Sequence, residues 1–312
     1  MQFEQPGNSQ QSSGSYSEPF SRKKRGFLVF LLDQSGSMRE EFIWKGYKLT
    51  LAQMATTIIN NLLVTVIDNA KVDSQTGLRK DYCDILIYGY GNEVLPLLNR
   101  TGTPVSVSML ADKPVGRHKV RVTMYDPIKG QDVSVEQEQP FWITPHGQSE
   151  YTEMAAAIRA AYQGVESWLK ADPRRRFSFP PIVINITDGR HNGRSNDNPV
   201  HEARKLQNLR TDDGAVLLFN CHLTTAANTQ KLSFPSSVEE IQRMNLSDGD
   251  RLGVRQLFEI SSIVPSTMTL RAQHVFGRNL PSGARGFMYN ASPQDLLTFL
   301  SWGTRQSSEF VQ

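Results

Sequence analysis

The feature that most constrains this chain is a series of short, continuous apolar runs separated by longer stretches with helical spacing. The first run is Phe27 to Leu32, and it contains no polar residue. A strand that is apolar on both faces is covered on both faces, which is typical of parallel strands in α/β proteins. The sequence therefore predicts an α/β fold with an open, mostly parallel, doubly wound sheet, in which Phe27 to Leu32 is a central strand.

The remaining elements follow from the same pattern. We expect further strands at residues 82–88, 182–186, 215–219 and 286–289. We expect helices at residues 40–68, 153–169, 200–209, 238–244, 253–262 and 293–302. The longest of these, residues 40–68, carries apolar residues close to helical spacing from Leu49 to Val66. No repeat with a period of about 20 to 50 residues is present, which excludes a solenoid or propeller.

Residues 93–147 interrupt this alternation. Val120 to Met124 and Val133 to Val135 read as two alternating strands around a turn that contains Pro127 and Gly130. The sequence therefore predicts a β-rich insertion over residues 93–147. Whether this insertion has a function or only covers an edge of the sheet stays open.

The two ends of the chain differ from the part between them. Residues 1–25 are rich in Gln, Ser and Gly and have too few apolar residues to offset the entropy of ordering, so we expect a disordered polar tail. This tail ends in the basic run Arg22 to Arg25, which we interpret as a solvated charge run rather than a nucleic-acid patch. We expect one domain over residues 26–303 and a second short tail over residues 304–312.

Charge and cysteine content limit the function classes. The chain has 34 Lys and Arg against 31 Asp and Glu, a net charge of +3, which argues against a dedicated nucleic-acid binder. No apolar run approaches the roughly 18 residues that a membrane span needs, and no secretory start is visible. Cys83 and Cys221 both lie in strand-like runs, which favours free buried thiols. We therefore expect a cytoplasmic protein with no membrane association.

A candidate site follows the first strand directly. Asp33, Ser35 and Ser37 form the pattern Asp-x-Ser-x-Ser, and Gly36 between the serines allows a tight loop. Asp188 follows the strand at 182–187, and it reaches the same edge if the two strands are parallel neighbours. Carboxylate and hydroxyl oxygens suit Mg²⁺ and poorly suit Zn²⁺. The sequence therefore predicts a cation site at the carboxyl end of the sheet.

The order of these features resembles the von Willebrand factor A domain, a Rossmann-like fold, with its metal-ion-dependent adhesion site. The shared features are the apolar strand, Asp-x-Ser-x-Ser, a long helix, a Thr at a helix start, and a strand ending in Thr187-Asp188-Gly189. The resemblance covers residues 26–303. It implies that Thr152 is the remaining metal ligand, with Met154, Ala157 and Ile158 at the family's offsets; Ser149 is an alternative that fits less well.

The resemblance also implies a function. The metal, Mg²⁺ or else Mn²⁺ or Ca²⁺, is held by Asp33, Ser35, Ser37, Thr152 and Asp188, and a partner protein supplies a Glu or Asp carboxylate as a further ligand. The chain is then a protein-interaction module and not an enzyme. Intracellular bacterial members of the family accompany stress-response, kinase, phosphatase or ATPase systems, so a partner of that kind is expected. The insertion at 93–147 would then either shape partner specificity or only cover an edge.

The alternative is a metal-dependent hydrolase, a phosphoesterase or peptidase, that uses the same site. The chain has no Gly-x-x-x-x-Gly-Lys-[Ser/Thr] phosphate loop, and Ser35 stands where a phosphoryl-transferring site usually has a second Asp. A serine nucleophile needs a positioned histidine, and His191 is the one candidate near Asp188. We interpret His191 as a surface loop residue, and His201 and Glu202 as too isolated for a zinc site.

Overall fold

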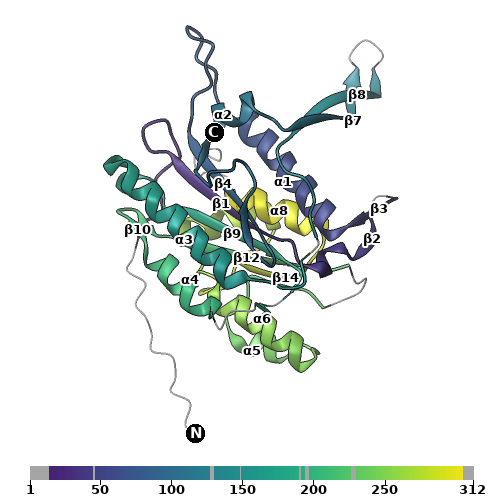
Figure 1. Ribbon diagram of the computed structural model, residues 1–312, viewed down its shortest axis with the longest axis vertical. Helices are drawn as coiled ribbons and strands as arrows, with labels where there is room; N and C mark the ends of the chain where they lie inside the picture. Colours follow the sequence, from purple (N-terminus) through teal and green to yellow (C-terminus); the bar gives the residue numbers. More distant parts are fainter. Residues whose placement is uncertain are drawn as a thin grey trace.

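A computed structural model describes residues 14–44, 46–126, 130–147, 149–189, 191–193, 197–225 and 230–304. Its centre is an eight-stranded sheet with helices on both faces (Figure 1). The five central strands run parallel and are β14 (Phe287–Ala291), β12 (Leu217–Leu223), β9 (Ile182–Thr187), β1 (Gly26–Asp33) and β4 (Cys83–Tyr90), in this spatial order. The expected α/β fold with a mostly parallel, doubly wound sheet is confirmed.

Short antiparallel strands close the sheet at its edges. On one side β13 (Leu232–Ser233) pairs with β14, and on the other β5 (Val94–Pro96) and β6 (Val105–Ser106) pair with β4. A separate pair, β10 (Arg210–Thr211) and β11 (Gly214–Ala215), lies before β12. Because an edge strand leaves backbone groups unpaired, short edge strands limit pairing with other chains.

The continuous apolar run of β1 is explained by two cores. Leu28, Phe30 and Leu32 face one hydrophobic cluster, and Phe27, Val29 and Leu31 face the other. The first cluster is formed with α1 (Leu51–Asp68), α2 (Val107–Asp112), α7 (Ser266–Phe276) and α8 (Pro293–Thr304). The second is formed with α3 (Met154–Ala171), α4 (Pro199–Asn208), α5 (Val238–Gln242) and α6 (Asp248–Ile260). Burial on both faces makes β1 a central strand, as the sequence predicts.

Helix α1 begins later than the sequence indicates. Residues expected at the start of a helix over 40–68 form the hairpin β2 (Glu41–Trp44) and β3 (Tyr47–Thr50) instead. Aromatic and β-branched residues and a turn at Gly46, which has φ +83°, favour strands there. The helix then starts at a capping box, in which Thr50 accepts from the Gln53 backbone and Gln53 accepts from Thr50.

Helix α1 is also long and apolar enough to cross a membrane, with a mean hydropathy of 1.3, although the sequence shows no unbroken apolar run of that length. Of its residues, 67% are buried, as in the core helix of a globular domain. Length and composition therefore give only weak indication of a membrane span.

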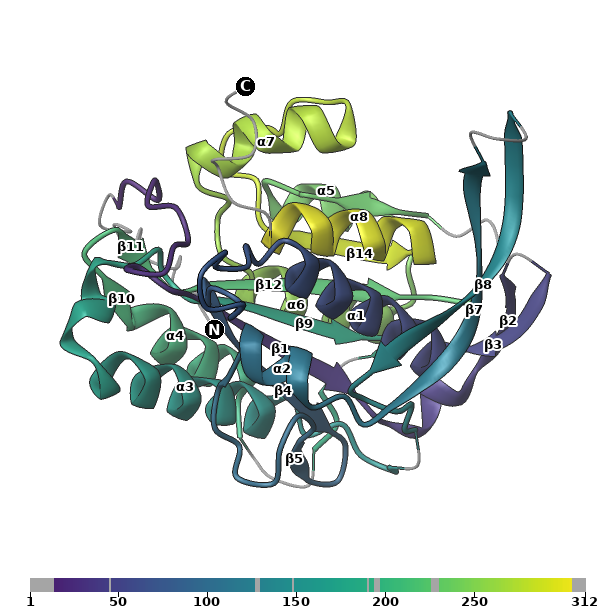
Figure 2. The same cartoon turned by 90° about the horizontal axis from the view of Figure 1, so that it is seen from above.

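The insertion at 93–147 contains the expected hairpin. Strands β7 (Gly116–Asp126) and β8 (Gln131–Phe141) pair along their whole length. They form a long ribbon that projects from the side of the molecule on which β2 and β3 also project (Figure 2). The β-rich character of this segment is confirmed; the middle of its expected turn, residues 127–129, lies outside the described residues.

Residues 14–25, expected as part of a disordered tail, pack against the domain. The backbone amides of Ser17 and Glu18 donate to the carboxylate of Asp213 at 3.1 and 3.0 Å, and Phe20 lies edge-on to Phe179. Two aromatic residues, Tyr16 and Phe20, supply the apolar area that the rest of the segment lacks. The expectation of disorder for residues 1–13, and of a tail at 305–312, concerns residues outside the described part of the chain.

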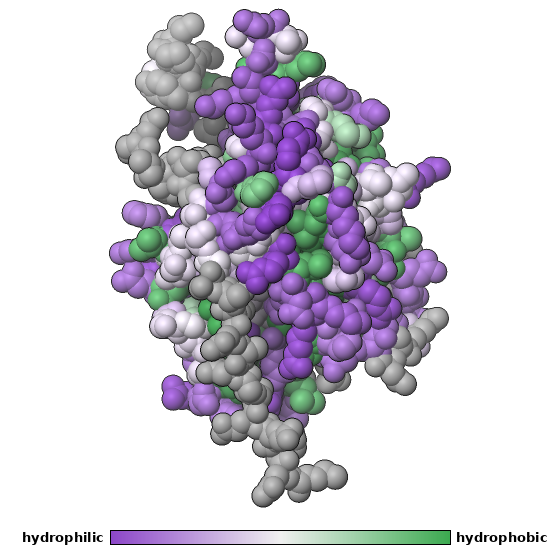
Figure 3. Space-filling model, turned by 90° about the vertical axis from the view of Figure 1, so that its left-hand side faces the viewer, coloured by the Kyte–Doolittle hydropathy of each residue, from purple (hydrophilic) through white to green (hydrophobic). Residues whose placement is uncertain are grey.

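The basic run Arg22 to Arg25 and the arginines of the 3₁₀ helix η2 (Pro173–Phe177) meet at the amino end of the sheet. Arg25 and Arg175 both pair with the buried carboxylate of Asp84, at 3.3 and 3.6 Å, and Trp168 donates to it at 2.8 Å. In the same loop as Arg175, Arg174 pairs with Asp172. The surface on the side of β10 is mainly hydrophilic, with hydrophobic residues only in small separate areas (Figure 3). Arg25, Arg174 and Arg175 are thus each paired with a carboxylate.

Both cysteines are free and buried, in β4 and β12. Burial raises the pKa of each thiol well above its usual range. They are structural residues of the core.

Candidate metal centre

The sheet places the predicted site residues at one edge. Strands β1 and β9 are parallel neighbours, and Leu32 lies opposite Ile186 in the register. Asp33 and Thr187 therefore end the two strands side by side, and Asp188 follows immediately. In an open α/β sheet, ligands bind beyond the carboxyl ends of the strands.

The loop after β1 brings the hydroxyl of Ser37 to Asp188 and the hydroxyl of Ser35 beside that of Ser37. The backbone N–H of Ser35 donates to Asp33 Oδ1 at 2.8 Å, which folds the loop back over the strand end. Ser37 Oγ donates to Asp188 Oδ1 at 2.9 Å, and the two serine Oγ atoms lie 3.1 Å apart. A 3₁₀ helix, η1 (Gly36–Arg39), follows and holds this turn. Four of the five predicted ligands thus form one hydrogen-bonded cluster.

Thr187 is a site residue that the sequence analysis quoted only as part of a strand end. Its Oγ1 donates to Asp33 Oδ2 at 2.6 Å and accepts from the Gly189 backbone at 3.1 Å. Asp33 therefore receives one hydrogen bond on each carboxylate oxygen. No local sequence pattern signals this role, because the contact depends on the register of β1 against β9.

Thr152 and Ser149, the alternatives for the fifth ligand, lie in one loop before α3. Ser149 is directly beside the serine loop, because Gly36 N–H donates to Ser149 O at 2.6 Å. Thr152 is buried, with its N–H on Asn192 Oδ1 at 2.6 Å and its carbonyl on His191. Among the described residues, no hydrogen bond joins the Thr152 hydroxyl to the other four predicted ligands. Its ligand role stays a prediction.

Because Gly91 has no side chain, the loop that contains Ser149 can lie close to the end of β4. A Cβ atom at Gly91 would overlap the Ser149 side chain, so any larger residue at the end of β4 would displace this loop. The Glu153 backbone N–H also donates to Gly91 O at 3.0 Å. The site is thus built on three strand ends, those of β1, β4 and β9.

The electrostatics of the cluster are unfavourable without a cation. Burial, together with the charge of Asp33, raises the pKa of Asp188 to about 7. Burial also raises the pKa of Asp33, although Thr187 and Ser35 donate to it. Among the described residues, neither carboxylate has a Lys or Arg ion-pair partner. Two carboxylates that repel each other and have no described basic partner indicate a place for a cation.

The donor chemistry fits a hard divalent cation. The cluster offers carboxylate and hydroxyl oxygens, and no group of three or more His, Cys, Asp or Glu that could hold a metal occurs in the described residues. Asp33 and Ser35 are buried, whereas Ser37 is exposed, so the cluster opens to solvent on the Ser37 side.

The histidines named by the sequence do not reach this cluster. His191 Nδ1 bonds to the Thr152 carbonyl at 2.9 Å, which fixes that ring against the backbone. Glu202 is buried and pairs with Arg159 at 3.6 Å and Lys205 at 3.1 Å, a structural ion-pair cluster.

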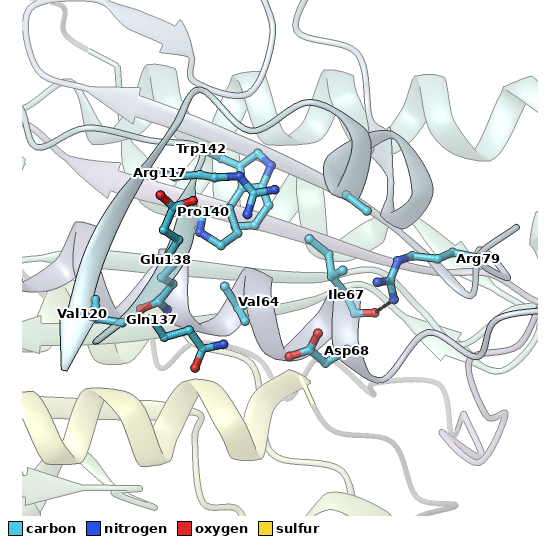
Figure 4. Close-up of a pocket in the computed structure, with 12 residues that line it drawn as sticks. Val64, Ile67, Asp68, Arg79, Arg117, Val120, Gln137, Glu138, Pro140 and Trp142 are labelled. Carbon is cyan, nitrogen blue, oxygen red and sulfur yellow. Dashed lines mark hydrogen bonds between the residues drawn. The ribbon is translucent and has the colours of Figure 1, made fainter. Parts of the chain in front are cut away.

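A separate hollow of about 500 Å³ lies at the other end of α1, beside the base of the β7–β8 ribbon. Figure 4 shows the charged residues Asp68, Arg79, Arg117 and Glu138 around the apolar Val64 and Ile67. Arg79 is held there by the Ile67 carbonyl at 2.9 Å. The predicted ligands lie at the amino-terminal end of α1, so this hollow is not part of the metal centre.

Solved structures of similar fold include von Willebrand factor A domains. Proximal thread matrix protein 1 of the mussel byssus has 16% identity and a TM-score of 0.36, over 67% of this chain and 40% of that one. The ArnB paralog VWA2 of Sulfolobus acidocaldarius has 12% identity and a TM-score of 0.37, over 88% and 43%. The von Willebrand factor type A protein of Catenulispora acidiphila has 10% identity and a TM-score of 0.38, over 81% and 52%.

This chain thus covers about half or less of each of these proteins. No protein-family model and no curated protein matches it. At such identities and TM-scores the likeness carries no argument about function, which depends on the residues described above.

Proposed function

We propose that this chain is a divalent-cation-dependent protein-interaction module of the von Willebrand factor A type. The observation that supports this best is the pairing of Asp33 and Asp188. Two carboxylates with raised pKa values lie with Ser35 and Ser37 at the end of two parallel strands, without a described basic partner. A divalent cation bound there would remove the repulsion between them.

The predicted ligands would contribute to cation binding in two ways. Asp33 and Asp188 would supply charge, and the hydroxyls of Ser35, Ser37 and Thr152 would supply neutral oxygens, directly or through water. Two carboxylates only balance a divalent charge, so the ion keeps affinity for a further anionic oxygen. The exposed side at Ser37 is where a partner's Glu or Asp carboxylate would enter. The cation would thus link this chain to the carboxylate of its partner protein.

The alternative, a hydrolase using the same site, has less support. A serine nucleophile needs a base within hydrogen-bond reach. The Ser37 hydroxyl donates to Asp188 Oδ1 at 2.9 Å, and no hydrogen bond joins a described histidine to the hydroxyl of Ser35 or Ser37. The described residues at the site therefore offer binding groups and no histidine base, and the carboxylate that accepts from Ser37, Asp188, is itself a predicted metal ligand.

The partner and its location belong to the same proposal. The proposed site would bind a protein that carries an exposed acidic side chain. We propose that this partner is a kinase, phosphatase or ATPase of an intracellular stress-response system. Its test is cation-dependent capture rather than any feature of the fold.

Calorimetric titration with Mg²⁺ and Mn²⁺ tests the cation site. We expect wild-type protein to bind one ion, and Asp33→Ala and Asp188→Ala to weaken binding by more than the about 10–100-fold that loss of an outer-shell partner costs. Asp132→Ala, an exposed carboxylate on β8, is the matched control and should bind as wild type. Circular dichroism shows whether each variant folds. If Asp188→Ala does not fold, Asp188→Asn replaces it, because asparagine keeps the shape of the aspartate side chain.

Capture and turnover separate the two functions. Wild-type bait should retain a protein partner with Mg²⁺ and release it with chelator, and Asp188→Ala should retain none. Purified protein should not turn over phosphoesters or peptides. Turnover that disappears in Asp188→Ala would support the hydrolase, and equal Mg²⁺ binding by all variants would rule out the site.

A further inference from the structure

Arg39 is a charged residue beside the candidate metal centre that the proposed function does not use. It is the last residue of η1, two positions after Ser37, and its side chain is exposed. The cluster opens to solvent on the Ser37 side, so a partner that enters there meets Arg39 as well. A guanidinium has a fixed charge and five N–H donors, and it binds carboxylates through two parallel hydrogen bonds.

Two glycines allow the Arg39 side chain to lie against the serine loop. A Cβ atom at Gly147 would be 3.1 Å from Arg39 Cγ, and one at Gly36 would be 3.5 Å from Arg39 Nη2. Arg39 Nε also lies 3.5 Å from the Gly36 carbonyl oxygen. Gly36 stands between Ser35 and Ser37, whose Oγ atoms are 3.1 Å apart. The guanidinium therefore lies beside the loop that carries the two predicted hydroxyl ligands.

The carboxylates of this region accept hydrogen bonds from other groups. Asp33 and Asp188 accept from neutral donors of the serine loop, at 2.8 and 2.9 Å, and no described ion pair joins either of them to Arg39. Glu40, the next residue along the chain, accepts from Thr225 Oγ1 at 2.6 Å, in the segment after β12. Within the described part of the chain, the Arg39 guanidinium thus has no ion-pair partner, and it can bind an anion of another molecule.

We propose that Arg39 is a specificity-determining residue, and that the partner carries two neighbouring acidic side chains, of which one binds the cation and the other binds the Arg39 guanidinium. This inference rests on the proposed function. A cation alone selects an acidic group but not the residues beside it. A second contact at Arg39 selects a partner with two acidic residues close together, and it fixes the direction in which the partner segment crosses the site.

Blocked peptides that contain Glu-Gly-Glu, Glu-Gly-Gln or Gln-Gly-Glu between Gly-Ser flanks are the probes. Residues two apart lie on one side of an extended peptide, so both Glu side chains can reach one surface. Calorimetry first sets the Mg²⁺ concentration that saturates each protein variant, and NMR titration at about 0.15 M salt then measures peptide affinity. We expect wild type to bind Glu-Gly-Glu at least about fivefold more tightly than either peptide with one Glu, the upper range for an exposed charge pair.

Variants of Arg39 show whether this preference comes from the guanidinium. In Arg39→Gln the three peptides should bind within about twofold of one another, because only the choice of which Glu binds the cation remains. Arg39→Lys keeps the charge without the planar fork and should give an intermediate preference; it is also the second variant if Arg39→Gln does not fold. Arg204→Gln, at an exposed arginine of α4, is the matched control and should keep the wild-type preference. Thermal unfolding checks the fold of each variant.

The outcomes separate this inference from the proposed function. An equal preference for Glu-Gly-Glu in wild type and Arg39→Gln overturns the role of Arg39. An equal loss for all three peptides in Arg39→Gln also overturns it, because Arg39 would then contact the carboxylate that the cation binds. Both results leave the proposed function intact. If chelator does not weaken any peptide complex of wild type, the proposed function is wrong, and the comparison with Arg39→Gln still decides the role of Arg39. Absence of binding by all three peptides overturns both.

Discussion

At the scale of single residues, the candidate site is defined by two carboxylates that have no Lys or Arg partner among the described residues. Asp33 receives hydrogen bonds from Ser35 and Thr187, and Asp188 receives one from Ser37, yet burial still raises the pKa of both. Neutral donors therefore do not replace the positive charge that the described basic residues do not supply. The same property makes the site sensitive to pH.

We expect cation binding to weaken in acid. The pKa of Asp188 is raised to about 7, so below that pH a proton must leave before a cation binds, and affinity falls about tenfold per pH unit for each proton released. Titrations at about pH 5.5 and about pH 7.5 measure this, with binding stronger at the higher pH. Equal affinity at both values would contradict it.

The stability of the metal-free protein follows from the same shift. The folded pKa of Asp188 lies above the unfolded value near 4, so between these values the folded state binds the extra proton. Stability from this group is therefore present at low pH and lost as pH rises through about 7. Thermal unfolding in chelator should show this loss for wild type and not for Asp188→Asn, and Mg²⁺ should stabilise wild type more as pH rises.

Among the site residues, the sequence predicts those whose spacing is local. Asp33, Ser35 and Ser37 follow from one loop, and Asp188 follows from the end of a second apolar strand. Thr187 was not assigned a role, because its contact with Asp33 depends on the register of β1 against β9, which no local pattern gives. The choice between Thr152 and Ser149 likewise depends on the path of the loop that contains both residues and lies close to Gly91, and the sequence does not indicate that path.

At the scale of elements, the sequence predicts the buried strands best and the helix starts least well. A strand such as β1 is continuous and apolar because two cores cover it, and this leaves a clear pattern. Hairpin β2–β3 has Phe42 and Leu49 at spacings that continue the apolar face of α1, so it reads as helix. Helix α7 was missed because only Met268, Arg271 and Ala272 along it are buried.

The capping box of α1 gives a prediction at this scale. Thr50→Ala removes the side chain that accepts from the Gln53 backbone, and we expect a loss of about 1 kcal/mol in the free energy of unfolding. Chemical denaturation measures the loss, and Mg²⁺ affinity should not change because Thr50 is not a site residue. Thr50→Ser keeps the oxygen and should restore most of the stability. A loss as large in Thr50→Ser would exclude the cap as its cause.

At the scale of the whole molecule, two ribbons leave the compact sheet on one side. Strand β8 is exposed along most of its length, and the side chains of Lys119 and Arg121 on β7 are 73% and 81% exposed although both lie near Glu136. Exposed ion pairs of this kind add little stability. The described ion pairs of the ribbon therefore contribute little to the stability of the domain.

We expect the domain to survive removal of this ribbon. His118 and Gln139 are paired in the register, so replacing residues 119–138 by Asn-Gly closes the strands with a two-residue turn. The variant should unfold cooperatively and bind Mg²⁺ within about twofold of wild type, since none of the predicted ligands is changed. Calorimetry and thermal unfolding measure both. Loss of Mg²⁺ binding in a folded variant would show that the ribbon supports the Ser149 loop.

The two buried thiols have a practical consequence for such experiments. Since Cys83 and Cys221 are enclosed and stay protonated, a maleimide dye should ignore the native chain and react only with a cysteine introduced at the surface, for example in Ser74→Cys. Fluorescence from a single attached dye could then follow complex formation without any cysteine being removed first.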